Sequence, residues 1–279
     1  MKKITAAFDG LKFSESAKEF ATHLAKLANA HLVGIFLDDF TYHSYKIYDL
    51  ISKEGVSDKI LNKYEGKDKA TRDKAVSNFE NACQKVPLNY TVHHDRNIAI
   101  QELLHESIYT DLLIIDSKET LTHYEEKTPT RFIRDFLTDV QCPVLLVPPK
   151  YKAIDKIVLL YDGEPSSVYA IKMFSYMFPF LKHLNTEVLT VKNTDQTLHV
   201  PDKKLMKEFM KRHYPKATYT TLKGISEIEI INHLKEEKEN VLIVLGAYRR
   251  GMVSRWFRTS MADVLMKELK IPLFIAHNK

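Results

Sequence analysis

An internal repeat constrains the fold of this chain more than any other feature. One apolar segment ends in Asp9 followed by glycine, and a second ends in Asp162 followed by glycine, 153 residues later. Each half also closes with an apolar segment that carries a proline near its start, at residues 142–147 and 270–275. Because the segments between these landmarks come in the same order in both halves, we predict a tandem duplication of one domain.

Strands and helices are predicted to alternate along both halves. Continuous apolar runs such as 112–115 are typical of strands that are covered on both faces of a sheet. Alternation with helical patterns predicts a parallel sheet between helices. We therefore predict two α/β domains, 1–149 and 150–279, each with a five-stranded parallel sheet flanked by helices. The predicted strands are 4–8, 31–37, 88–93, 111–116 and 142–148, and then 157–161, 187–191, 217–222, 240–246 and 271–276.

Composition excludes several classes of protein. With 44% hydrophobic and 28% charged residues, the chain is neither disordered nor collagen-like. Its two cysteines, Cys83 and Cys142, are too few for a disulfide framework or a cysteine-rich metal site. No apolar run approaches the roughly 20 residues that span a membrane, and Asp9 comes too early for a signal peptide. We expect a cytoplasmic protein without a membrane partner.

The net charge differs between the two halves. The chain carries +5 in all, of which residues 1–150 carry −2 (20 Lys and Arg, 22 Asp and Glu) and residues 151–279 carry +7 (21 and 14). This difference fits either a drift in surface charge or an anion that binds only to the second half. No nucleic-acid-binding motif accompanies the basic half, so we do not expect a nucleic acid partner.

Two aspartates lie where ligands bind in α/β proteins. In an open parallel sheet, ligands bind beyond the carboxyl ends of the strands, where the strand order reverses. Asp9 and Asp162 each end the first predicted strand of a half. Such a carboxylate can accept hydrogen bonds from adenine or ribose, but it can equally cap the turn that follows. Both interpretations stay open for Asp162, and capping is favoured for Asp9.

The loop after the fourth strand of the second half has the residues of a phosphate site. Gly246 and Gly251 would let backbone N–H groups approach an anion closely. Thr259 and Ser260 open the next helix, whose N-terminus favours phosphate. The alternative is an exposed basic loop. Four arginines suited to a phosphate clamp lie in this loop: Arg249, Arg250, Arg255 and Arg258.

The corresponding loop of the first half, residues 116–130, has a different character. It contains no glycine, and it carries acidic side chains that would repel phosphate. We therefore expect no nucleotide to bind in the first half by this route. The acidic residues are Asp116, Glu119, Glu125 and Glu126.

Catalytic and metal-binding patterns are weak by comparison. His93, His94 and Asp95 end a predicted strand, but no second cluster with ligand spacing accompanies them, so we interpret them as surface residues and predict no metal site. The sequence shows no Ser-His-Asp pattern, no P-loop and no paired catalytic carboxylates. We predict no catalytic residues.

These features resemble the universal stress protein family, with two UspA-type domains covering essentially the whole chain. The resemblance rests on the two strand-terminal aspartates, the serine-rich starts of the helices that follow them, the loop after Gly246, and the closing strands 142–147 and 271–275. It implies a Rossmann-like fold of the adenine nucleotide alpha hydrolase-like type in each half. It also implies that the two domains pair through their final strands, as two single-domain members do in a dimer. Further association into a homodimer stays open.

ATP-binding members of that family carry a glycine, two residues, a second glycine, nine residues, and then glycine with serine or threonine. Here Gly246 matches the first glycine and Ser260 the hydroxyl residue. Arg249 replaces the second glycine, Thr259 replaces the third, and Gly251 is an additional glycine. In the first half only Thr130 of this pattern remains.

The resemblance therefore implies an adenine nucleotide, ATP with Mg²⁺, in the second domain alone. Asp162 and Gly163 would contact the base or ribose. The phosphates would be surrounded by Gly246, Gly251 and Ser260, with help from Arg249.

Three functions follow from this interpretation. The leading one is a stress-response protein that binds ATP in its second domain and acts by signalling or by binding a protein partner. The alternative is a nucleotide-free interaction module that uses an insertion at residues 39–67, with its aromatic segment 42–48, as a binding face; that insertion could also simply pack on its own domain. A slow ATPase is a third, for which we identify no base or metal-binding carboxylate.

Overall fold

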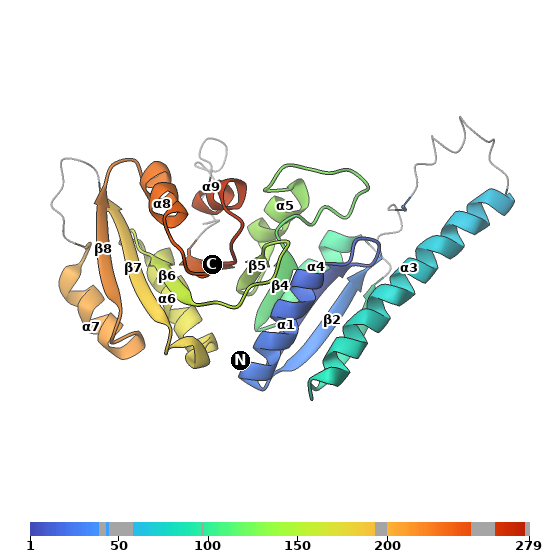
Figure 1. Ribbon diagram of the computed structural model, residues 1–279, viewed down its shortest axis with the longest axis horizontal. Helices are drawn as coiled ribbons and strands as arrows, with labels where there is room; N and C mark the ends of the chain where they lie inside the picture. Colours follow the sequence, from blue (N-terminus) through green and yellow to red (C-terminus); the bar gives the residue numbers. More distant parts are fainter. Residues whose placement is uncertain (39–42, 45–57, 96–97, 193–199, 247–259, 277–279) are drawn as a thin grey trace. The chain divides into compact units, whose positions relative to one another are not determined.

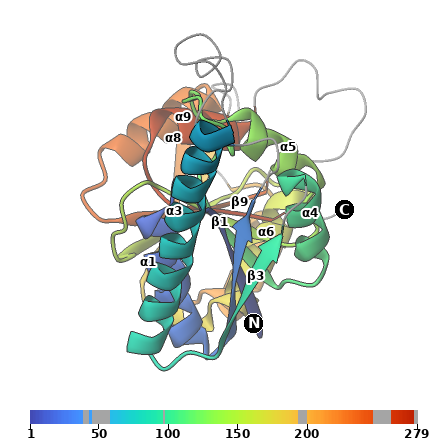
Figure 2. The ribbon, with the colours of Figure 1, turned by 90° about the vertical axis from the view of Figure 1, so that its right-hand side faces the viewer.

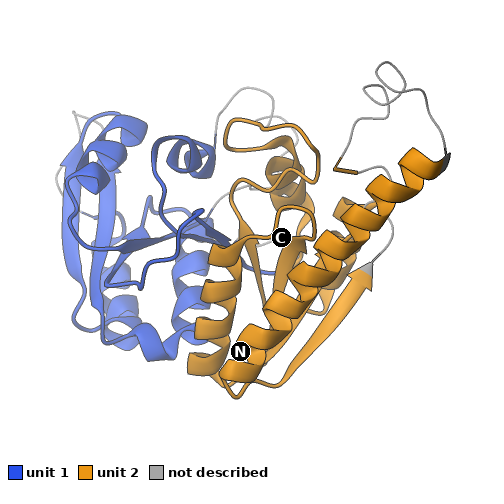
Figure 3. Cartoon of the chain, turned by 45° about the vertical axis from the view of Figure 1, so that its right-hand side comes forward, with its two compact units in different colours: residues 1, 142–279 blue, residues 2–141 orange. Residues whose placement is uncertain are grey.

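The structure is a computed structural model that describes residues 1–38, 43–44, 58–95, 98–192, 200–246 and 260–276 (Figure 1). Its contacts divide it into two compact units, residues 2–141 and residue 1 with residues 142–279 (Figure 3). Each unit has strands alternating with helices along the chain, so the predicted α/β fold is confirmed. No helix in the described ranges is both long and apolar enough to cross a membrane.

The unit of residues 2–141 contains four parallel strands in the order β3-β2-β1-β4. Figure 2 shows α1 and α3 on one side of these strands, with α4 and α5 on the other. The strands are β1 (Lys3–Asp9), β2 (His31–Leu37), β3 (Tyr90–Asp95) and β4 (Leu112–Asp116). The helices are α1 (Glu15–Ala28), α3 (Asp58–Lys85), α4 (Ala99–Ile108) and α5 (Arg131–Asp139).

Helices on both faces explain why these strands are apolar along their whole length. Every residue of β1 and of β2 after the first is buried. In the core, the Phe8 ring lies 5.2 Å from that of Phe36 and 5.5 Å from that of Phe79, which comes from α3. Fully burying such a ring contributes roughly 1.5–3 kcal/mol to the free energy of folding. This aromatic cluster fixes α3 against the sheet.

The second unit contains six strands in the order β5-β10-β9-β6-β7-β8. Figure 2 shows α8 and α9 together on one side and α6 on the other, where α6 packs against β9 and β10. The strands are β5 (Val144–Val147), β6 (Lys156–Leu160), β7 (Asn185–Lys192), β8 (Thr218–Lys223), β9 (Val241–Leu245) and β10 (Leu273–Ile275). The helical segments are α6 (Pro165–Met177), η1 (Pro179–Leu181), α7 (Lys203–His213), α8 (Ser226–Lys235) and α9 (Met261–Glu268).

The final strands of the two repeats pair with each other. Leu146 of β5 lies opposite Leu273 of β10, and Val144 lies opposite Ile275, in an antiparallel register. All four residues of β5 are buried, so the pairing places an apolar strand edge in the interior. This is the pairing that the family resemblance implied. It also explains why β5, which belongs to the first repeat in sequence, falls in the second compact unit.

Candidate functional site

A cavity of about 150 Å³ lies at the carboxyl ends of the strands in the second unit. Its walls come from the ends of β6, β7 and β9 and from the starts of α6, α8 and α9. In the order β9-β6-β7 the chain passes from β6 to β7 on one side and later returns to β9 on the other. The cavity therefore lies at a reversal of strand order, where open α/β sheets bind ligands. Asp162, Gly246 and Met261 all contribute to its lining.

Gly246 packs directly against the start of α6. A Cβ atom at this position would lie 2.5 Å from both the carbonyl carbon and the carbonyl oxygen of Ser166. No side chain can be accommodated at that distance from backbone atoms, so only glycine allows the chain to leave β9 here. The predicted glycine is thus required by packing within the chain, and it brings the backbone to the cavity wall.

Asp162 ends β6 in a tight turn. Its Oδ1 atom accepts a hydrogen bond of 2.9 Å from the backbone N–H of Glu164, which is the turn-capping role expected as one of two interpretations. Gly163 between them has φ +90°, a conformation that favours glycine. Asp162 is exposed and lies in the lining of the cavity.

Tyr161 also lines the cavity, and the sequence analysis missed it. Its side chain is buried, and its hydroxyl donates a 3.2 Å hydrogen bond to the carbonyl oxygen of Pro201. Burial raises the pKa of this phenol, and the negative charges of Asp202 and Asp162 raise it further. An alignment of the two repeats could have found this residue. The residue before the aspartate is Phe8 in the first repeat and Tyr161 in the second, so only the second repeat places a phenol at this position.

Ser260 lies at the start of α9, beside the cavity residue Met261. Its hydroxyl accepts a hydrogen bond of 3.3 Å from the backbone N–H of Ala262 and so caps the helix. The structure therefore gives Ser260 a structural role at the place predicted for a phosphate contact. Arg249, Gly251 and Thr259, predicted as further members of the site, lie outside the described residues, as do the other arginines of that loop.

The corresponding loop of the first repeat is closed by its own hydrogen bonds. The carboxylate of Glu119 accepts hydrogen bonds from the backbone N–H groups of Thr120 (2.9 Å) and Leu121 (3.0 Å), and Leu121 adopts a left-handed conformation with φ 49°. The hydroxyl of Thr130 donates to the carbonyl oxygen of Glu119 at 2.5 Å and caps α5 by accepting from Ile133 N–H. A carboxylate of the chain thus occupies backbone donors of the kind that an external anion would use.

Electrostatics at this closed loop disfavour a phosphate. Burial raises the pKa of Glu119, and the nearby charges of Asp9 and Asp116 raise it further. Asp9 is buried and accepts a 2.7 Å hydrogen bond from Leu11 N–H, which is the capping role favoured from sequence. Asp116 accepts bonds from the hydroxyl of Ser14 (2.6 Å) and from Lys118 N–H (2.9 Å).

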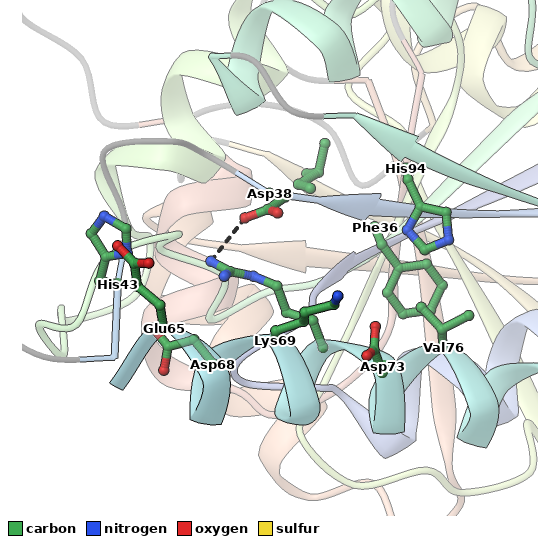
Figure 4. Close-up of a pocket in the computed structure, with 12 residues that line it drawn as sticks. Phe36, Asp38, His43, Glu65, Asp68, Lys69, Asp73, Val76 and His94 are labelled. Carbon is green, nitrogen blue, oxygen red and sulfur yellow. Dashed lines mark ion pairs between the residues drawn. The ribbon is translucent and has the colours of Figure 1, made fainter. Parts of the chain in front are cut away.

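A larger cavity of about 670 Å³ lies elsewhere in the unit of residues 2–141, between α3 and the ends of β2 and β3 (Figure 4). Phe36 and His94 form a stacked wall, with ring centroids 6.0 Å apart. Arg72 from α3 and Asp38 both line the cavity and form an ion pair of 2.9 Å. The sequence analysis did not predict this cavity. Its α3 wall belongs to a helix that begins at Asp58, within the insertion predicted at 39–67.

The helix α3 therefore accounts for part of the predicted insertion at 39–67. Residues 58–67 form the first turns of α3, and Ser44 N–H donates a 2.9 Å hydrogen bond to Asp68 on the same helix. Of the aromatic segment 42–48, only residues 43 and 44 lie within the described ranges.

Metal-ligating side chains gather at one place in the described ranges, where Glu187, His233 and Glu237 bring ligand atoms within 4.8 Å of one another. The Lys156 ammonium lies between the carboxylates, 2.8 Å from Glu187 and 2.5 Å from Glu237. Burial alone would raise the pKa of Glu187, but its hydrogen bond to Lys156 helps to hold the pKa below its ordinary value. The positive charge that a metal would supply is thus already present. Of the histidines singled out from sequence, His93 contacts Glu106 at 2.7 Å.

Comparison with solved structures identifies the fold. A universal stress protein from Archaeoglobus fulgidus superposes with a TM-score of 0.71 at 13% identity, covering 99% of this chain and 98% of that protein. A protein of unknown function from Pseudomonas aeruginosa gives a TM-score of 0.62 at 12% identity, covering 99% and 92%. No protein-family model matches the chain, and no curated protein matches it by sequence. The chain therefore has the fold of a tandem universal stress protein.

Proposed function

We propose that this chain is a tandem universal stress protein that binds one adenine nucleotide, ATP with Mg²⁺, in its second repeat. It would act in the cytoplasm during stress, by signalling or by binding a protein partner. The observation that carries the proposal is the cavity at the carboxyl ends of β6, β7 and β9, where the strand order reverses.

Three features of that cavity suit a nucleotide. Gly246 follows β9 and has no side chain, so the backbone itself forms this part of the cavity wall. The N-terminus of α9 begins beside it, and free N–H groups at a helix start favour phosphate. The exposed carboxylate of Asp162 has an oxygen to offer to the hydrogen-bond donors of a base or ribose. In the first repeat, the corresponding loop is closed by Glu119, which accepts hydrogen bonds from the loop's own backbone N–H groups.

A variant that fills the cavity without disturbing the tight packing at Gly246 tests the proposal. Val191 on β7 lines the cavity and is half-buried, so Val191→Phe should occupy the ligand space with the fold intact. We expect ATP with Mg²⁺ to raise the melting temperature of the wild-type protein but not that of this variant. Val92→Phe, at a half-buried strand position of the first repeat, is the matched control and should keep the full shift. An equal shift in Val191→Phe and wild type would remove the site from consideration.

A nucleotide-free interaction module is the second candidate, and one observation favours it. Gly246 and Ser260, the two motif residues in the described ranges, each have a role within the chain, one in packing against Ser166 and one in capping α9. If wild-type protein shows neither binding heat nor a thermal shift with ATP, these internal roles suffice to explain both residues and the interaction module becomes the better account.

A further inference from the structure

A second groove in the unit of residues 142–279 lies at the opposite end of its strands from the nucleotide cavity. It has a volume of about 690 Å³ and is lined at the amino ends of β6, β7 and β8, at the C-terminal end of α7, and by the turn after η1. From Thr186 in this groove to Val191 in the nucleotide cavity, β7 rises roughly 16 Å. The two sites are therefore separate.

Positive charge dominates this groove. Four of its lining residues are lysine or arginine and two are histidine, against a single carboxylate, that of Glu239. Lys156 is already committed to Glu187 and Glu237. The lysine, arginine and histidine residues of the lining are Lys156, Lys182, His183, Arg212, His213 and Lys216.

Three of these cations have no carboxylate partner among the residues that the structure describes: Lys182, Arg212 and Lys216. The Lys182 ammonium instead lies 5.9 Å from the ring centroid of Tyr214. Burial lowers the pKa of His213, and the positive charges of Lys182 and Lys172 lower it further. Like charges gathered in this way repel one another, so an anion in the groove would relieve the repulsion.

The position of α7 explains only part of this arrangement. Basic residues in the last turn of a helix interact favourably with its dipole, which accounts for Arg212 and His213. It does not account for Lys182 and Lys216, which reach the same groove from other segments. Tyr214 also contributes to the lining, and its buried hydroxyl has no hydrogen-bond partner within the described ranges. A buried hydroxyl without a partner costs free energy that an acceptor would recover.

We propose that this groove binds a small anion that carries several closely spaced phosphate groups. Arginine and lysine from separate segments suit such a group, because a guanidinium pairs with two phosphate oxygens and ammonium groups supply point charges. The groove volume suits a compact ligand. Inorganic tripolyphosphate is the simplest probe that has this chemistry.

Titration of the full chain with tripolyphosphate, at ionic strength matched with sodium chloride, tests the proposal. We expect saturable binding by the wild type and at least tenfold weaker binding when Lys182, Arg212 and Lys216 are all replaced by glutamine. The matched control replaces Lys203, Lys204 and Lys207 by glutamine. These are exposed lysines of α7 outside the groove lining, so the control changes the net charge by the same amount as the test variant. The control should bind as the wild type does.

Two further comparisons distinguish binding in this groove from binding at other anion sites. Val191→Phe, which fills the nucleotide cavity, should leave tripolyphosphate binding unchanged; a loss there would assign the binding to the nucleotide site and overturn the proposal. Equal weakening in the control triple variant would show general charge attraction and would also overturn it. If a single-stranded oligonucleotide binds the protein and tripolyphosphate does not, the groove is part of an extended surface for nucleic acid. That result would overturn the proposal of a compact phosphate site.

Discussion

The backbone of Gly246 lies so close to that of Ser166 that a Cβ atom on the glycine would be 2.5 Å from the serine carbonyl oxygen. This contact joins the end of β9 to the start of α6, and Gly246 forms part of the wall of the proposed nucleotide cavity. It explains why a glycine follows β9 and links the proposed site to the stability of the second unit.

Gly246→Ala should lower the free energy of unfolding by about 3 kcal/mol, because the added methyl group must push apart two backbone segments in a packed interior. Urea unfolding measures the change. Gly66→Ala on α3 is the control: no atom lies within 4 Å of the added Cβ, so helix propensity should raise stability by about 0.5–1 kcal/mol. A Gly246→Ala protein as stable as wild type would show that the close contact does not exist.

Ser260→Ala separates capping from ligand binding. Loss of the cap on α9 should lower the free energy of unfolding by about 1 kcal/mol. If the hydroxyl also contacts phosphate, as the family resemblance implies, the rise in melting temperature on adding ATP should shrink too. Ser14→Ala, which removes the cap of α1 in the first repeat, should lower the melting temperature without changing the ATP-dependent rise. An unchanged rise in Ser260→Ala would restrict this residue to capping.

Glu119→Gln tests the closed loop of the first repeat through its pH dependence. Because burial raises the folded-state pKa of Glu119 above the ordinary 4.5, the folded protein retains a proton that the unfolded chain has lost. Stability from this group is therefore present at low pH and falls as pH rises from the ordinary value through the raised one. A glutamine oxygen can accept the same two backbone hydrogen bonds without carrying a charge.

The variant should consequently be more stable than wild type at about pH 8.5, with little difference at about pH 5. Glu125→Gln, an exposed change in the same loop, should have no such pH-dependent effect. Unfolding curves at the two pH values give the comparison. If Glu119→Gln were less stable than wild type at the higher pH, the charged carboxylate would be essential to the loop and the explanation given for it would be wrong.

Lys156→Met should destabilise the second unit by about 3 kcal/mol, because it leaves the buried carboxylate of Glu187 without the ammonium that neutralises it. Adding Glu187→Gln to this variant should recover part of the loss. A double-mutant cycle in urea measures the coupling. Strict additivity of the two changes would contradict the ion-pair network.

The sequence predicted the order of elements well because the strands are buried on both faces. Runs such as Leu112–Asp116 and Val241–Leu245 are apolar throughout, and their type follows from composition and length. The start of α3 could not be predicted in this way. Its first turns from Asp58 are mostly polar and bury few side chains, so no periodic apolar face marks them.

The position of the cavity was predictable, but its internal contacts were not. Topology alone places Asp162 and Gly246 at the ends of neighbouring strands, and both residues line one cavity in the structure. The contacts of each residue could not be predicted from the sequence. The packing of Gly246 against Ser166 and the hydrogen bond from Glu164 N–H to Asp162 depend on the local backbone conformation. The internal bonds of Glu119 likewise depend on the left-handed turn at Leu121.

The most direct test of the central claim is calorimetric titration of the nucleotide-stripped full chain with ATP and Mg²⁺. The account predicts a single binding event per chain, since the second repeat has an open cavity whereas Glu119 closes the loop of the first. Two events per chain would show that the first repeat opens to nucleotide in solution. The absence of any binding heat up to millimolar ATP would contradict the nucleotide site altogether.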